Sequence, residues 1–193
     1  MIDISSEPIP EHEHLDDTQC YAILKKYAPS DEILDMVHAH GRRVADKALE
    51  VAEKVPGIDM RFIRSAALMH DIGRFRRPPG QPGSIRHGIE GAKVLRKEGL
   101  EMHARVAERH IGIGITAEDI REQGLDLPEQ DFSPRTPEEL LIAYADNLDN
   151  DGIQDERYVE DRYAREVGEY MRERVRAFHN RIHQLTGSTS DRY

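Results

Sequence analysis

The sequence has 193 residues and a formal net charge of −10. This length suits one sizeable hydrophobic core rather than two comfortable domains. General nucleic-acid binders set Lys and Arg against phosphates, so the acidic charge disfavours that class, although a local basic cluster can bind a small phosphorylated ligand. The single cysteine, Cys20, cannot form an internal disulfide. No apolar run approaches the ~20 residues of a transmembrane helix, and no signal peptide is evident, so we expect a cytoplasmic protein.

The helical period dominates, and no stretch alternates as a strand does, which predicts an all-α fold. A polar tail at residues 1–15 precedes a short helix at 16–27 and a long helix that begins after the N-cap Ser30. Asp59 is expected to cap the next helix. Helices are expected at residues 31–54, 60–70, 87–98, 102–110, 137–147 and 158–185. Thr116 and Thr136 both resemble the start of a capping box, and Thr136 is the better match.

The strongest chemical feature is His70-Asp71, followed by Ile72-Gly73, at the end of an apolar helix. Adjacent helical residues point about 100° apart, but the backbone turns away at a helix end, so Asp71 can approach a cation that His70 binds. Burying both groups without a compensating cation would be costly. By itself, the dipeptide favours a simpler interpretation, a helix C-terminus with a polar cap.

Four further residues extend this feature. His40 lies on the apolar stripe of the long helix, and the adjacent Gly41 leaves room for close helix approach; His38, on a parallel row, stays an alternative. Four histidines and two aspartates from different helices suit one convergent site in a bundle. The other three candidates each lie on a separate helix or helix end: His87, His110 and Asp146.

The order H…HD…H…H…D, with H-x-x-R-V-A first and H-D-I-G second, resembles the HD-domain phosphohydrolase superfamily. The later H-G-x-x-G-A and A-D-N-L segments are similar to an archaeal-type subgroup of small HDIG-domain proteins. The resemblance covers roughly residues 31–150. It implies an all-α HD-domain helical bundle, which we place at 16–150. The helical pattern adds a long C-terminal helix within 151–185, and a tail is expected at 186–193.

The resemblance also implies a ligand set for one or two divalent metals. The first metal would be held by His40, His70, Asp71 and Asp146. Asp71 would bridge to a second metal held by His87 and His110, and these three would be the catalytic residues. Mixed imidazole and carboxylate ligands favour Fe, Mn or Zn over Mg. A single-metal enzyme in which His87 and His110 contact the substrate is an alternative.

The activity implied is hydrolysis of a phosphomonoester, phosphodiester or phosphoanhydride in a nucleotide or small phosphate ester, by in-line attack of a metal-bound hydroxide on phosphorus. The missing G-Y-P signature counts against cyclic di-GMP, and the extra histidines count against the single-metal deoxynucleotide triphosphohydrolases. The alternative function is a catalytically idle HD module that binds a nucleotide as a sensor or scaffold.

The segment 72–86 is expected to be a loop, since it holds three prolines, and it carries several arginines and no acid. Arginine pairs well with phosphate oxygens, so these side chains are candidate phosphate ligands, although a solvated basic loop is the alternative. The candidates in the loop are Arg74, Arg76, Arg77 and Arg86. Arg43, one turn from His40, is a weaker candidate.

Other histidines are interpreted without a chemical role. His12 and His14 in the tail, and His179 and His183 on the last helix, are expected at the surface, and His103 is expected to lack a partner. The last helix also carries a partial apolar stripe that makes a homodimer plausible. Its members are Val159, Tyr163, Val167, Tyr170 and Val175.

Overall fold

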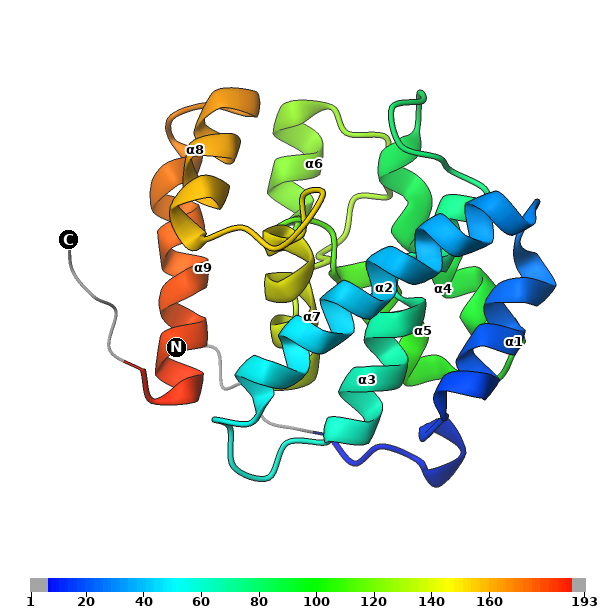
Figure 1. The fold of residues 1–193 in the computed structure, drawn as a ribbon. Coiled ribbons are helices and arrows are strands. Elements are labelled where there is room, and N and C mark those ends of the chain that lie inside the picture. The colour runs from blue at the N-terminus through cyan, green and yellow to red at the C-terminus, as the bar shows by residue number, and fades with distance from the viewer. Residues whose placement is uncertain (1–6, 189–193) are drawn as a thin grey trace.

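The expected all-α fold is confirmed by a computed structural model that describes residues 7–188 (Figure 1). Within this range the only strand-like pairing is a single bridge between Asp149 and Ile153, and no helix is long and apolar enough to cross a membrane. The helices are α1 (Asp17–Tyr27), α2 (Asp31–Ala52), α3 (Met60–Met69), α4 (His87–Lys97), α5 (Glu101–Arg109), α6 (Ala117–Gln123), α7 (Pro137–Leu148), α8 (Glu156–Glu166) and α9 (Met171–Thr186), with short 3-10 helices η1 (Glu11–Glu13), η2 (Ile72–Phe75) and η3 (Ser84–Arg86).

The long helix α2 packs across α3 and α7, as Figure 1 shows. Its N-cap is Ser30, and α3 is capped by Asp59, as expected. A Cβ on Gly41 would lie 2.7 Å from the Leu68 carbonyl oxygen, so the expected close helix approach is confirmed. Helix α7 is buried on all sides except at Asp146, which is typical of a central helix. The hydrophobic core therefore surrounds α7, and Asp146 is the half-buried residue of this helix.

The two predicted capping boxes form to different extents. Thr116 forms a complete box with Asp119, since each side chain accepts the other residue's backbone N–H. Thr136 accepts from the Glu139 N–H, but the Glu139 carboxylate binds Arg109 at 2.7 Å instead of closing the box. The expectation that Thr136 starts the better box is therefore wrong, because an ion pair from α5 competes for the glutamate.

The described part of the expected polar tail contacts the core through Glu13. This buried carboxylate accepts from the Met102 and His103 backbone N–H groups, where the dipole of α5 favours an anion. The buried ring of His103 bonds Glu13 through Nδ1 (2.9 Å) and the Ser65 hydroxyl through Nε2 (2.9 Å). The expectation that His103 lacks a partner is wrong, because its partner lies about 90 positions earlier in the chain.

The histidines of the same segment differ from each other. His12 is exposed, as expected. His14 is only 11% exposed and donates to the Asp59 carboxylate at 2.6 Å, so its expected solvation is wrong. This contact joins the segment to the N-cap of α3.

The expected single helix at 158–185 is wrong, because it is broken into the α8–α9 hairpin. Gly168 adopts φ +147°, a conformation that favours glycine, between the two helices. Figure 1 shows α8 beside α9 at the edge of the bundle. Ion pairs between the helices join Asp161 to Arg172 (2.5 Å) and Glu160 to Arg176 (2.8 Å). A hairpin preserves much of the helical apolar spacing, and for this reason the pattern alone suggested one helix.

The hairpin changes the interpretation of the apolar stripe and of two histidines. Val159 and Val175 are buried within the chain's own core, whereas Val167 and Tyr170 are exposed at the turn. A homodimer therefore stays a prediction without this stripe as support. His179 is buried, so its expected surface position is wrong; His183 is half-buried.

Candidate metal centre

The six residues that the sequence pattern singles out as metal ligands lie together in the bundle. Five parts of the scaffold position them. His40 comes from α2, His70 and Asp71 from the end of α3, His87 from the first turn of α4, His110 from the end of α5, and Asp146 from α7. The alternative first histidine, His38, packs edge-on against Tyr21 instead, with ring centroids 5.0 Å apart.

Three of the donor atoms form one tight group. His40 Nε2 lies 3.0 Å from Asp146 Oδ1 and 3.2 Å from His70 Nε2, and His70 Nε2 lies 3.3 Å from the same Asp146 oxygen. Imidazole and carboxylate ligands of a common cation lie at such separations. This group could hold a metal ion.

A second group adjoins the first. His87 Nε2 and His110 Nε2 lie 3.0 Å apart, and Asp71 Oδ1 lies 3.3 Å from the first and 3.5 Å from the second. The other oxygen of Asp71, Oδ2, lies 3.7 Å from His40 Nε2. Asp71 therefore stands between the two groups with one oxygen toward each.

Backbone carbonyls orient three of the imidazoles. His70, His87 and His110 each donate from Nδ1 to the carbonyl oxygen of the residue three positions earlier, at 2.7, 2.8 and 2.9 Å. A carbonyl oxygen only accepts, so Nδ1 carries the proton, and in the neutral ring Nε2 presents a lone pair to the site. Lone pairs this close repel one another unless a cation lies among them. The donor set fits one or two divalent metal ions.

The charges of the two carboxylates and of His87 agree with this fit. Although burial opposes ionisation, hydrogen bonds and nearby charges of the histidines hold the pKa values of Asp71 and Asp146 well below the usual range. Burial lowers the pKa of His87 to about 3, so this ring is neutral at pH 7. For His40, burial is outweighed by Asp146 and the other carboxylates, which raise the pKa to about 9. A metal ion would have to displace that proton.

Asp149 is a site residue that the sequence interpretation missed. Its carboxylate is 1% exposed and accepts from His40 Nδ1 at 2.7 Å, so it orients the fourth imidazole. Arg43 binds both oxygens of Asp149 at 2.9 Å. The predicted role of Arg43 as a phosphate ligand stays untested, but its observed partner is this carboxylate. One feature of the sequence could have pointed to Asp149, namely its position directly after the A-D-N-L segment.

Asn147, in the same segment, links the centre to the hairpin. Its side-chain amide donates to the Gly112 carbonyl at 2.6 Å, and its Oδ1 accepts from the Tyr163 hydroxyl at 2.8 Å. This pairing joins α7 to α8 and to the turn after α5. The role of Asn147 was not predicted, because its partners lie in segments with no recognised motif.

The glycine of the His-Asp-Ile-Gly segment has a packing role. A Cβ on Gly73 would lie 1.8 Å from the His87 carbonyl oxygen and 2.6 Å from the Gly91 nitrogen. Only glycine therefore lets η2 rest against the first turn of α4. This contact brings the Asp71 end of α3 within reach of His87.

The four loop arginines do not form one free basic surface. Arg74 contacts both oxygens of Asp71 through Nε, at 3.2 and 3.3 Å, and so lies beside the metal centre. Arg86 pairs with Asp126 at 2.9 Å, and Arg76 lies 3.6 Å from Glu90. Their roles, and that of Arg77, as phosphate ligands stay predictions.

Sequence relatives cover most of the chain. The tRNA (cytidine(56)-2'-O)-methyltransferases of Picrophilus torridus and Thermoplasma volcanium are 34% and 33% identical over 178 residues, or 91% of this chain. The chain spans about half (49%) of the length of these two relatives. An uncharacterized protein of Methanocaldococcus jannaschii is 40% identical over 128 residues, which are 66% of this chain and 71% of that protein.

Solved structures share the fold. The HD domain of the Listeria monocytogenes phosphodiesterase PgpH has a TM-score of 0.50 and 17% identity, covering 87% of this chain and 97% of that one. The same domain in complex with cyclic-di-AMP has a TM-score of 0.50 and 18% identity, covering 90% and 98%. The family model described as "HD domain" matches residues 37–151, which include all six clustered residues. This chain belongs to the HD-domain family.

Proposed function

We propose that this chain is a metal-dependent phosphohydrolase that acts on a nucleotide or another small phosphate ester or anhydride. One observation carries the proposal: four imidazole nitrogens and two ionised carboxylates converge, with Asp71 between two donor groups. Without cations, this cluster of buried lone pairs and negative charge would be costly.

Divalent ions bound there would lower the pKa of water toward neutrality and offset negative charge on phosphoryl oxygens. The protein's own contribution is orientation. The carbonyls of Ala67, Ser84 and Ala107 hold three rings with Nε2 toward the centre, and Asp149 holds the ring of His40. Such support tunes metal affinity in other proteins, where its loss typically costs 10–100-fold.

Arg74 is the loop arginine best placed to meet a substrate phosphate, because it contacts Asp71 and is 23% exposed. A guanidinium offers planar, paired donors to phosphate oxygens. A nucleotide is supported by the cyclic-di-AMP complex of the PgpH domain, an HD domain that binds a nucleotide. This support rests on shared fold alone.

The proposal is tested by removing metal from the purified chain, adding back Mn²⁺, Fe²⁺ or Zn²⁺, and measuring phosphate release or ester cleavage across a nucleotide panel. We expect turnover that depends on the added ion. Nucleotide binding without turnover under every metal condition would contradict hydrolysis.

The role of Arg74 is tested separately by steady-state kinetics. Arg74→Ala should raise KM, because a charge-assisted bond to phosphate is lost. Arg61→Ala is the matched control, since this arginine is 67% exposed at the opposite end of α3. If KM and kcat of the Arg74 variant equal those of the control, the loop arginine has no part in phosphate binding.

A second candidate is a catalytically idle HD module that binds a nucleotide as a sensor or scaffold. It is favoured by the two relatives named as tRNA methyltransferases, which match this chain over only half of their length. In such a protein, the HD domain could serve an activity located elsewhere in the chain. Tight nucleotide binding by the metal-loaded protein, with no hydrolysis, would support this candidate over the first.

A further inference from the structure

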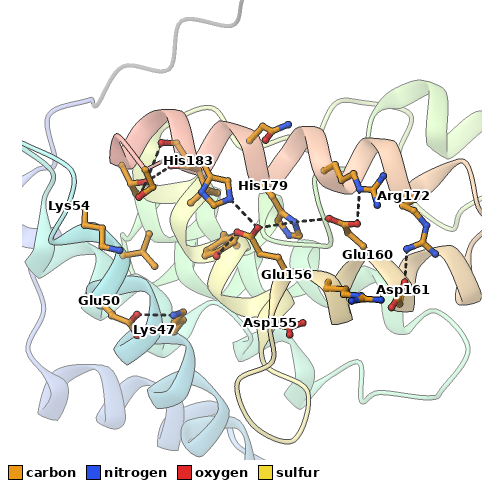
Figure 2. A pocket seen from close by; sticks show the side chains of 18 residues that line it. Lys47, Glu50, Lys54, Asp155, Glu156, Glu160, Asp161, Arg172, His179 and His183 are labelled. Atoms are coloured by element: carbon orange, nitrogen blue, oxygen red, sulfur yellow. Dashed lines mark hydrogen bonds and ion pairs between the residues drawn. The ribbon is translucent and has the colours of Figure 1, made fainter. Parts of the chain in front are cut away.

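An open cavity lined by many charged and imidazole side chains lies beside the C-terminal hairpin, away from the metal centre. Residues of α8 and α9 line it together with residues of α7 and of the end of α2, and its volume is about 1340 Å³ (Figure 2). None of the six clustered ligand candidates lines it. The cavity therefore needs an explanation independent of the proposed hydrolysis.

His179 is the unusual residue of this cavity. It is 2% exposed, yet neither ring nitrogen has a hydrogen-bond partner within the described part of the chain. Two carboxylate oxygens approach its Nδ1 without bonding to it, Glu156 Oε2 at 3.8 Å and Glu160 Oε1 at 4.0 Å. Figure 2 shows the ring between these two carboxylates. Buried polar groups are normally satisfied, so this imidazole indicates a missing partner.

Two further donors lie on the same face of the hairpin. His183 is one turn after His179 on α9, and its Nε2 lies 3.0 Å from Glu156 Oε2. The other oxygen of Glu156 accepts from the Tyr144 hydroxyl at 2.9 Å, which orients the carboxylate. Two histidines four residues apart on a helix can bind one ion together. Here they face a carboxylate from the neighbouring helix.

We propose that His179, His183 and Glu156 form a second cation site, selective for a divalent transition-metal ion such as Zn²⁺. Ligands held tetrahedrally at about 2.0–2.1 Å from Zn²⁺ lie roughly 3.3 Å apart. The two distances to Glu156 Oε2, 3.0 and 3.8 Å, fall on either side of that separation. A distance of 3.8 Å is too long for a hydrogen bond but suits two ligands of one ion.

The state of His179 suits a ligand. Burial lowers its pKa, although Glu156 and Glu160 oppose the shift, so the ring is neutral at pH 7 and offers a lone pair. The three donor atoms do not all lie within 4.8 Å of one another, unlike those of the metal centre. For all three residues to bind one ion, the partly exposed side chains of Glu156 (29%) and His183 (24%) must rotate. We therefore expect weaker binding here than at the centre.

The residues of α9 that face Glu156 differ from those that face the other acids of α8. Nearer the turn, the acids of α8 pair with arginines of α9, as Glu160 does with Arg176 and Asp161 does with Arg172. At the following turns, the residues of α9 are His179 and His183. Arginine would satisfy Glu156 in a simple ion pair, whereas imidazoles bind a metal ion. A bound ion would join α8 and α9, and α7 through Tyr144.

The test is a count of bound Zn²⁺ per chain of 193 residues after titration with Zn²⁺ alone, with thermal unfolding measured in parallel. His183→Ala and Glu156→Gln change partly exposed side chains, and circular dichroism checks that each variant is folded. His12→Ala is the matched control, since His12 is exposed on η1.

We expect both variants to bind one ion fewer than the parent and the control, and to lose part of the Tm increase that Zn²⁺ produces in the parent. Asp71→Ala should keep the hairpin ion, which separates this site from the metal centre. An ion count in His183→Ala and Glu156→Gln equal to that of the parent would overturn the proposal. An equal loss in His12→Ala would overturn it as well, since the binding would then be nonspecific.

Discussion

The metal centre and the C-terminal hairpin contrast in how far their sequences reveal their structures. At the centre, every candidate ligand predicted from the motifs lies within one cluster, although the residues span His40 to Asp146. At the hairpin, regular apolar spacing suggested one helix, and the structure has two. Motif residues are specified by their chemistry, whereas a helix break at one glycine barely changes the periodic pattern.

The two regions also differ in what their buried polar groups require. Imidazoles at the centre have each Nδ1 satisfied by a fixed acceptor, which leaves Nε2 for a ligand. In the hairpin, His179 has neither nitrogen satisfied. The centre is therefore preorganised, and the proposed hairpin site requires side-chain movement. The following changes test this difference, from the largest expected effect to the smallest.

Asp71→Ala should have the largest effect, because Asp71 stands between both donor groups. We expect kcat/KM to fall by about 10³-fold or more, equivalent to roughly 4 kcal/mol of transition-state stabilisation. Metal content and hydrolysis rate are measured on the same sample, with circular dichroism to confirm folding. Activity within tenfold of the parent would remove Asp71 from the catalytic site.

Asp149→Asn should weaken metal binding without removing a ligand. The amide cannot match the charge-assisted bond to His40 Nδ1, and loss of such support typically costs 10–100-fold in affinity. Competition with a chelator measures the change. Asp46→Asn is the matched control, since Asp46 is 71% exposed on α2, the helix that carries His40. Equal affinities in the two variants would contradict the positioning role of Asp149.

Gly168→Ala should destabilise the hairpin while leaving the metal centre intact. A Cβ there would lie 2.9 Å from the Tyr170 ring, on a backbone with φ +147°. We expect a loss of about 1–2 kcal/mol in the free energy of unfolding and an unchanged kcat. Gly57→Ala is the control: φ is +76° there, but a Cβ would meet nothing within 4 Å. An effect no larger than that of the control would rule out the Tyr170 contact as a cause.

Arg174→Ala should have the smallest effect, and the effect should depend on pH. Arg174 joins α9 to α6 through two bonds to Asp119, at 2.5 and 2.8 Å. Since Arg174 is partly exposed, we expect a loss of about 1 kcal/mol near pH 7 in urea unfolding.

The direction of the pH effect follows from the pKa of Asp119. Bonds from Arg174 hold this pKa below its ordinary value. A carboxyl group whose pKa is lower in the folded state than in the unfolded state stabilises the fold at pH values above the unfolded-state pKa, about 3.9. This stabilisation is lost progressively as the pH falls from there toward the folded-state pKa. The stability difference between parent and Arg174→Ala should therefore shrink from pH 5 to pH 2. A difference that stays constant over this range would contradict the ion pair as its source.

The sequence was most informative where residue type and helical spacing act together. His40 was favoured over His38 by its place on the apolar stripe, and the helix boundaries followed the caps Ser30 and Asp59. Contacts between distant segments escaped prediction. Glu13 reaches His103 and Asp149 reaches His40 only in the folded chain, and no local spacing encodes such pairs. Helix-period patterns specify which face is buried, but not which polar groups meet across it.

The most direct test of the central claim is electron paramagnetic resonance of the Mn²⁺-loaded protein. If Asp71 bridges two ions held by the clustered residues, the parent should give an exchange-coupled spectrum from a pair of neighbouring ions. This signal should be absent from Asp71→Ala. A parent spectrum that contains only isolated Mn²⁺ at full loading would contradict a two-metal centre.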